Sequence, residues 1–281
     1  MAGILNELRR VKWAMRVALV RGGQRWRFRQ LRRRHLPILF GNSMAKSGSH
    51  VLAQFLEGLT LVSPLVFTDA HGIRTQDSRG LPRSTGSVMR DLRRLKSGDI
   101  GWGYIPSQAE YVAYLTQPSV RMIFVYRDPR DKIISHILYA TGIHQGHAMR
   151  AFYESLPTME ERISATIAGV PGMVENVRQT YESYLGWLDE PLVVKVKFED
   201  FVNEQPATVE RLLEELAGAG VPLSVSTGDA VSRVVQAMAP EKSPTFRSGT
   251  SGEWERHFTA KNRKEFEEVA GNLLERLGYS A

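Results

Sequence analysis

The chain of 281 residues contains no cysteine, which excludes disulfide bonds, thiolate metal sites and a cysteine nucleophile. It also has no apolar run near the ~18 to 20 residues that a membrane-spanning helix requires, so we expect the catalytic body to be soluble. The absence of cysteine is compatible with a reducing compartment, and we expect a cytoplasmic protein. With 42% hydrophobic residues and no linker, repeat or low-complexity tract, the chain can bury the core of one large domain.

Acidic residues are nearly absent from the first 34 positions. This segment carries eleven Lys or Arg against the single acid Glu7, a net charge of +10, so the rest of the chain has +7 − 10 = −3. The basic character therefore belongs to an N-terminal arm, residues 1–34. The domain that follows, residues 35–281, is mildly acidic and is not expected to bind nucleic acid.

The arm has apolar residues at helical spacing, with basic residues off that face. The apolar face consists of Ile4, Leu8, Val11, Met15 and Ala18. Three interpretations remain open: peripheral contact with an anionic membrane, a helix packed on the domain with a solvated basic face, and a cleaved targeting peptide. The last of these lacks an apolar core with a small-residue cleavage site.

A short apolar run beginning at Ile38 stops at a turn of small and polar residues that contains Lys46. From Ser47 the pattern predicts a helix, so the order is strand, loop, helix. Backbone N–H groups of such a loop, with the positive end of the helix dipole behind them, favour a phosphate or sulfate, and Lys46 adds a full charge. A Walker A loop needs Gly directly before the Lys, and here Ala45 occupies that position, which argues against an ordinary ATP site.

A second strand, predicted over residues 122–126, is followed by Arg127-Asp128-Pro129. Asp128 is a good helix N-cap and Pro129 suits the first helical position, which puts Ser135 nearly two turns into that helix. An Arg at the carboxyl end of a strand offers a planar fork of donors to a phosphate, and the Ser135 hydroxyl supplies one more. The alternative for Arg127 is a structural ion pair with a nearby acid.

Further elements are predicted downstream and between these motifs. We expect a last strand over residues 192–200, which contains Phe198, and a final helix over residues 266–277. Residues 72–98 indicate a long surface loop, for which an acceptor-binding lid is the natural role. His144 and His147 lack a carboxylate or Cys partner at ligand spacing, which favours a loop over a metal site. Near the C-terminus, Arg247, Ser248 and Gly249 precede Gly252-Glu-Trp254 and Phe258-Thr259.

Three of these segments, at Lys46, at Arg127 to Ser135 and at Arg247 to Gly249, resemble in this order the motifs of the PAPS-dependent sulfotransferases. The resemblance implies a single α/β domain with a central, mostly parallel sheet flanked by helices, which the alternation of strands and helices suggests independently. It also implies that the first loop, similar to the family's Pro-Lys-Ser-Gly-Thr-Thr, holds the 5′-phosphate and sulfuryl group of PAPS. The residues concerned are Lys46, Ser47, Gly48 and Ser49, with His50 at the helix start.

The same resemblance assigns the 3′-phosphate to the other two segments. Arg127 and Ser135 keep the spacing of the family's clamp, while Arg247 and the Gly249 backbone correspond to its Arg-Lys-Gly loop, with Ser248 in place of Lys. Phe198 stands where the family usually has a Tyr, so a hydroxyl contact to adenine is lost.

The reaction implied is in-line transfer of a sulfuryl group from PAPS to a hydroxyl or amine of a small-molecule, lipid or carbohydrate acceptor, leaving 3′,5′-ADP and needing no metal. Lys46 is the candidate for stabilising the charge on the leaving oxygen. The general base stays open among Asp69, His71 and Tyr104. We rank Asp69 first, because Asp69-Ala-His71 resembles the Glu-x-His of heparan sulfotransferases; Tyr104 stands where cytosolic members have a His.

Two other functions remain under consideration. A P-loop kinase of a small molecule would need a Gly before Lys46 and an acidic magnesium ligand, for which only Asp128 is available. A non-catalytic protein that binds anions or a membrane surface could use the same scaffold.

Overall fold

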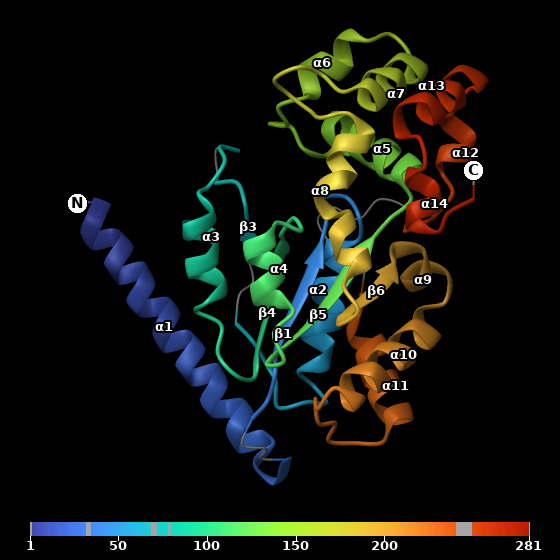
Figure 1. The fold of residues 1–281 in the computed structure, drawn as a ribbon. Coiled ribbons are helices and arrows are strands. Elements are labelled where there is room, and N and C mark those ends of the chain that lie inside the picture. The colour runs from blue at the N-terminus through green and yellow to red at the C-terminus, as the bar shows by residue number, and fades with distance from the viewer. Residues whose placement is uncertain (1, 32–34, 69–71, 78–79, 240–248, 281) are drawn as a thin grey trace.

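The computed structural model describes residues 2–31, 35–68, 72–77, 80–239 and 249–280, with side chains in the first helix described from Met15 onward. A six-stranded sheet lies at its centre in the order β2-β4-β1-β5-β6, and β3 also pairs with β4 (Figure 1). Every pairing is parallel. The strands are β1 (Ile38–Ser43), β2 (Val66–Phe67), β3 (Ile73–Arg74), β4 (Asp99–Tyr104), β5 (Val120–Tyr126) and β6 (Val193–Lys197). The predicted single α/β domain with a mostly parallel sheet is confirmed.

Helices cover both faces of the sheet, because alternate strand residues point to opposite sides. In β5, Met122 and Phe124 face one apolar layer, whereas Ile123 and Val125 face the other. The layer on the Ile123 side contains α2 (Ser49–Leu59), α9 (Phe198–Asn203), α10 (Gln205–Gly218) and α11 (Thr227–Ala237). The opposite layer contains α3 (Thr85–Leu92), α4 (Ala109–Leu115), α5 (Pro129–Leu138), the π-helix η2 (Tyr139–Ile143), α6 (Arg150–Ser155), α7 (Met159–Ala168), α8 (Val177–Asp189), α12 (Trp254–His257), α13 (Ala260–Ala270) and α14 (Leu273–Leu277).

The prediction of an irregular surface loop over residues 72–98 was wrong. This segment contains β3 and α3, and Val88 and Leu92 are fully buried. Ser84 caps α3 by accepting a hydrogen bond from the Ser87 amide. Strand β3 can approach β4 because Gly103 has no side chain; a Cβ there would collide with the Ile73 carbonyl oxygen.

Two predicted boundaries were also wrong. The last strand ends at Lys197, and Phe198 begins α9, because the Asp200 carboxylate accepts from the Lys197 amide and caps a helix at that point. The final helix is broken into α13 and α14 at Gly271, whose φ of 56° is incompatible with a continuous helix.

The N-terminal arm forms a long helix, α1 (Ala2–Arg27), followed by the short 3₁₀ turn η1 (Arg29–Leu31). Its C-terminal half contacts the β2 edge of the sheet (Figure 1). Arg21 donates two hydrogen bonds, of 3.1 and 2.6 Å, to the carboxylate of Asp99, which is 2% exposed. The Gln24 amide donates to the carbonyls of Thr60 and Leu65 at 2.9 Å each. The second half of α1 is therefore tied to the domain by polar contacts.

Candidate active site

The loop between β1 and α2 has the backbone conformation of an anion site. The Ser47 amide closes the turn on the Met44 carbonyl at 3.1 Å, and Lys46 has a φ of 66°. Lys46 is the only non-glycine residue with positive φ in the described part of the chain, and such conformations cluster at functional sites. Gly48 follows with a φ of 94°, and no side chain caps α2. The first N–H groups of α2 therefore lack an intrahelical acceptor and are directed toward the loop.

Phe198 connects this loop to the second motif. A Cβ on Gly48 would lie 2.6 Å from Phe198 Cδ2, so the ring can pack there only because position 48 is glycine. The Arg127 guanidinium lies 4.4 Å from the centroid of the same ring, within the range of a cation–π contact. The structure thus brings Gly48, Phe198 and Arg127, which are widely separated in sequence, into one group.

Arg127 is buried, at 6% exposure, and only partly paired. Its Nη2 donates to the Thr250 carbonyl at 3.2 Å and lies 3.5 Å from Asp131 Oδ2. Asp131 itself accepts hydrogen bonds from the amides of Gly252 and Trp254 at 2.8 and 3.0 Å. The ion pair considered as the alternative for Arg127 is therefore present, but Arg127 Nε is buried with no hydrogen-bond partner. An unpaired guanidinium N–H at this depth is costly unless an anion accepts from it.

The described part of the C-terminal motif, which begins at Gly249, lies beside Arg127. Arg247 and Ser248 lie outside the described residues, as do Asp69 and His71. Gly249, with a φ of 62°, is described, and the next residue, Thr250, receives the hydrogen bond from Arg127. Helix α5 begins as predicted, with Asp128 as N-cap and Pro129 in the first turn, and Ser135 lies half-buried on it.

On the other side of the loop, the Lys46 ammonium lies 3.7 Å above the ring centroid of Tyr139. Tyr139 opens the π-helix η2, a feature frequent at functional sites. The rings of His144 and His147 also contact Tyr139, at centroid distances of 5.6 and 5.7 Å. His136 lies 5.2 Å from His147. Sequence reasoning had assigned the two later histidines to a loop and missed His136 and Tyr139.

Burial disfavours the charged form of two of these imidazoles, His136 and His147. Burial, reinforced by the charges of Lys132, His147 and Lys46, lowers the pKa of His136 to about 3. Burial is also the main cause that lowers the pKa of His147, with His144 and Lys46 adding to it. A neutral imidazole beside a cationic loop can accept a hydrogen bond without adding positive charge. The spacing of His136, Tyr139 and Lys132 at three and four residues was the available sequence signal.

Of the three candidate bases, only Tyr104 lies within the described residues. Its hydroxyl donates to Ser49 Oγ at 2.9 Å, which places it against the loop. The Arg74 guanidinium lies 5.6 Å from the Tyr104 ring centroid, a cation that the loop prediction for residues 72–98 had overlooked. Burial, and then the charges of Lys46 and Arg74, lower the pKa of His50. Lys46, His50, Arg74 and Tyr104 thus surround the start of α2.

The family model for the sulfotransferase domain matches residues 42–278, which covers the loop, Arg127 and the C-terminal motif. The chain belongs to the sulfotransferase family. It is therefore a PAPS-dependent sulfotransferase, the activity that the three motifs predicted. In the part of this sulfotransferase that the structure describes, no group of three or more His, Asp or Glu could hold a metal ion, and no helix is long and apolar enough to cross a membrane.

Solved structures with the same fold include sulfotransferases at low sequence identity. A mouse sulfotransferase crystallised with PAP is 16% identical, with a TM-score of 0.59, covering 86% of this chain and 84% of its own. Retinol dehydratase with androsterone and the inactive cofactor PAP is 13% identical, with a TM-score of 0.53 and coverages of 85% and 80%. A second retinol dehydratase structure, with retinol and PAP, is 15% identical, with a TM-score of 0.51 and coverages of 85% and 82%. No curated protein sequence matches the chain.

Proposed function

We propose that the enzyme transfers a sulfuryl group from PAPS to a hydroxyl or amine of a small-molecule, lipid or carbohydrate acceptor by in-line displacement. The S–O bond to the 5′-phosphate breaks as a bond from sulfur to the acceptor atom forms. The acceptor proton passes to a general base, and 3′,5′-ADP leaves with the electron pair of the broken bond. The observation that carries this proposal is the partly paired, buried Arg127 beside a loop whose backbone suits a second anion.

The two ends of the nucleotide would be bound by different groups. Ser47, Gly48 and Ser49 would hold the 5′-phosphate through backbone N–H groups, with His50 at the helix start. Arg127, Ser135 and the segment Arg247, Ser248 and Gly249 would hold the 3′-phosphate. The Arg127 contact to Thr250 supports this grouping, because it brings the third segment to the guanidinium. Phe198, packed on Gly48 and Arg127, would set the distance between the two phosphate sites.

Lys46 is proposed to stabilise the oxygen that leaves with the 5′-phosphate. In a loose transition state, negative charge grows on that oxygen, so a cation placed there stabilises the transition state more than the ground state. A long Lys side chain has the reach to do this, and its ammonium now contacts the face of Tyr139 beside the loop. We propose that Lys46 exchanges this cation–π contact for the bridging oxygen when PAPS binds.

For the general base we keep Asp69 first, followed by His71 and Tyr104. The contact of Tyr104 with Ser49 supports a role for the phenol beside the loop, either as base or in orienting the acceptor. A carboxylate is a better proton acceptor than a phenol at neutral pH, which is why Asp69 ranks above Tyr104.

A P-loop kinase remains the contrasting hypothesis, and the site argues against it. Asp128, the one acid available as a magnesium ligand, caps α5 and also pairs with Arg130 at 2.8 Å. Retention on immobilised 3′,5′-ADP, with elution by 3′,5′-ADP and not by ATP, tests the nucleotide site. Release of 3′,5′-ADP from PAPS in the presence of an acceptor library then separates an enzyme from a non-catalytic anion-binding protein. Retention on ATP but not on 3′,5′-ADP would overturn the proposal.

We further propose that residues 1–34 form a membrane-facing arm added to the catalytic domain, residues 35–281. Met15, Leu19 and Trp26 lie on the side of α1 away from the domain and are 62%, 76% and 72% exposed. Basic side chains flank them, and the Arg29 guanidinium lies 5.5 Å from the Trp26 ring centroid. An apolar face edged by arginines suits the interface of an anionic membrane.

Sedimentation with vesicles tests the arm. Phosphatidylserine vesicles should bind the protein and phosphatidylcholine vesicles should not, and Leu19→Glu should abolish the binding. Equal behaviour of wild type and Leu19→Glu would show that the face does not contact lipid.

A further inference from the structure

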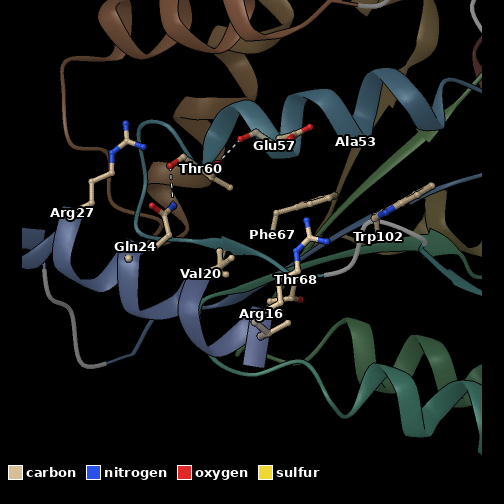
Figure 2. Close-up of a pocket in the computed structure, with 13 residues that line it drawn as sticks. Arg16, Val20, Gln24, Arg27, Ala53, Glu57, Thr60, Phe67, Thr68 and Trp102 are labelled. Atoms are coloured by element: carbon tan, nitrogen blue, oxygen red, sulfur yellow. Dashed lines mark hydrogen bonds between the residues drawn. The ribbon is translucent and has the colours of Figure 1, made fainter. Parts of the chain in front are cut away.

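A pocket of about 620 Å³ lies between α1 and the domain (Figure 2). One wall is the side of α1 that carries Val20 and Gly23. The facing wall combines Ala53 of α2 with Phe67 of β2 and Trp102 of β4, and Glu57 and Thr60 at the end of α2 add polar groups to it. Pockets that bind small molecules typically have volumes of about 300 to 1,000 Å³ and mostly apolar walls, and this one fits both criteria.

The pocket is long. Its lining residues on α1 extend from Arg16 to Arg27, eleven helical steps or roughly 16 Å at 1.5 Å per residue. Figure 2 shows Gln24 and Arg27 at one end and Arg16, Thr68 and Trp102 at the other, with Val20 and Phe67 between them. An elongated pocket with an apolar middle matches an alkyl chain better than a compact polar molecule.

The end at Trp102 adjoins the active site. Trp102 lines the pocket, and its ring packs edge-on against Tyr104 at a centroid distance of 5.7 Å. Tyr104 in turn donates to Ser49 of the anion loop. Thr68 follows the short strand β2, which pairs with the first residues of β4, and it lines the same end of the pocket. A molecule lying in the pocket can therefore extend toward the reacting groups.

We propose that this pocket binds the chain of a single-chain amphiphilic acceptor, with its hydroxyl-bearing head at the end formed by Arg16, Thr68 and Trp102. The inference rests on the proposed sulfuryl transfer and narrows its acceptor to an alkyl or isoprenoid alcohol or a lysolipid. The side of α1 that lines the pocket differs from the side that carries Met15, Leu19 and Trp26, because α1 turns by about 100° per residue. Helix α1 thus forms a wall of the acceptor site on one side while another side stays exposed.

Adjacent glycines in α1 provide a matched pair of variants. Gly23 lines the pocket and Gly22 does not, and a Cβ at either position would meet nothing within 4 Å. Gly23→Phe should fill the pocket, whereas Gly22→Phe makes the same chemical change toward the exposed side of the helix. Both changes also replace a helical glycine, so their effects on helix propensity cancel in the comparison.

Binding is measured without PAPS by adding 11-bromoundecanol, below its aggregation concentration, and following tryptophan emission. Bromine quenches indole at short range, so Trp102 should be quenched in wild type, and the Trp102→Phe variant identifies its share of the signal. Gly23→Phe should weaken binding by tenfold or more, because several methylenes lose their apolar surroundings. Gly22→Phe should bind as wild type. Absence of quenching, or equal binding by both glycine variants, would overturn the proposal.

Turnover distinguishes this inference from the proposed function. If 3′,5′-ADP is released with short phenols or sugars but no alkyl alcohol binds, sulfuryl transfer stands and the pocket inference fails. If the bromoalcohol binds in a Gly23-dependent manner but no acceptor supports release of 3′,5′-ADP, the chain site stands and the transfer proposal fails. If both hold, kcat/KM for linear alcohols should rise with chain length in wild type and in Gly22→Phe, but not in Gly23→Phe.

Discussion

Tyr104 donates a hydrogen bond of 2.9 Å to Ser49 Oγ, which joins the carboxyl end of β4 to the first turn of α2. The two residues are 55 positions apart, and parallel pairing of β4 with β1 brings them together at one edge of the sheet. The contact fixes a phenol beside the proposed 5′-phosphate loop. Tyr104 therefore stays, with Asp69 and His71, a candidate for the general base.

The general base is tested by comparing two conservative variants. Asp69→Asn should lose ~10² to 10⁴ in turnover while 3′,5′-ADP binding stays unchanged, because only the proton acceptor is removed. Tyr104→Phe should lose tenfold or less, as expected for an orienting hydroxyl. Steady-state kinetics and titration calorimetry measure the two properties. A near-normal Asp69→Asn enzyme alongside an inactive Tyr104→Phe enzyme would assign the role to Tyr104.

Lys46→Ala should reduce turnover by roughly 10² or more, the scale of losing one preorganised charge-stabilising donor. The affinity for 3′,5′-ADP should fall much less, because that product lacks the sulfuryl group on which the transition-state charge develops. Single-turnover release of 3′,5′-ADP and equilibrium binding measure the two effects. Equal losses in turnover and in affinity for 3′,5′-ADP would mean that Lys46 contributes only to nucleotide binding.

Arg127→Ala should weaken 3′,5′-ADP much more than 5′-AMP, since a charge-assisted contact to phosphate contributes ~1.5 to 3 kcal/mol. The buried Asp131 loses a partner in this variant but keeps its hydrogen bonds from Gly252 and Trp254, so a folded protein is expected. Circular dichroism checks the fold, and competition binding compares the nucleotides. Similar losses for both ligands would contradict the assignment of Arg127 to the 3′-phosphate.

One buried ion pair, between Arg21 and Asp99, contributes to the attachment of α1. Arg21→Ala should lower the free energy of unfolding by roughly 3 kcal/mol, because it leaves the Asp99 carboxylate, 2% exposed, without its cation. Arg25→Ala, at an exposed position in the same helix, should change it by less than ~0.5 kcal/mol. Urea unfolding measures both. If the two variants are equally stable, the Arg21 contact does not hold the helix.

The partly buried His136 should make the enzyme sensitive to acid. The pKa of about 3 for folded His136 lies below the 6.5 of an exposed imidazole, so between these values the unfolded chain binds a proton that the folded chain does not. The contribution of neutral His136 to the free energy of unfolding is fully present above pH ~6.5. It falls by up to ~1.4 kcal/mol per pH unit as the pH drops toward 3. Unfolding free energies at pH 6.5 and 5.0 should differ less in His136→Phe than in wild type. The exposed His35→Phe is the control and should behave as wild type.

Local patterns in the sequence were sufficient for the fold class and the family. The strand, loop and helix around Lys46, and the cap that Asp128 forms at α5, depend on residues within a few positions of one another. Their geometry follows from steric and hydrogen-bonding preferences that neighbouring residues determine. The wrong boundaries have a local cause as well. The end of β6 and the break at Gly271 each depend on a single residue, which a pattern of apolar residues does not detect.

The three-dimensional arrangement decided which of the distant residues meet. Packing of Phe198 between Gly48 and Arg127, the stacking of Lys46 on Tyr139 and the attachment of α1 through Asp99 all join segments far apart in sequence. No local preference encodes such contacts, because they follow from strand order and from which faces of the helices are buried. The sequence by itself therefore determined that the protein is a sulfotransferase with a basic helical arm. Only the tertiary structure decided that the arm forms a wall of a pocket, since one wall comes from α1 and the facing wall from α2, β2 and β4.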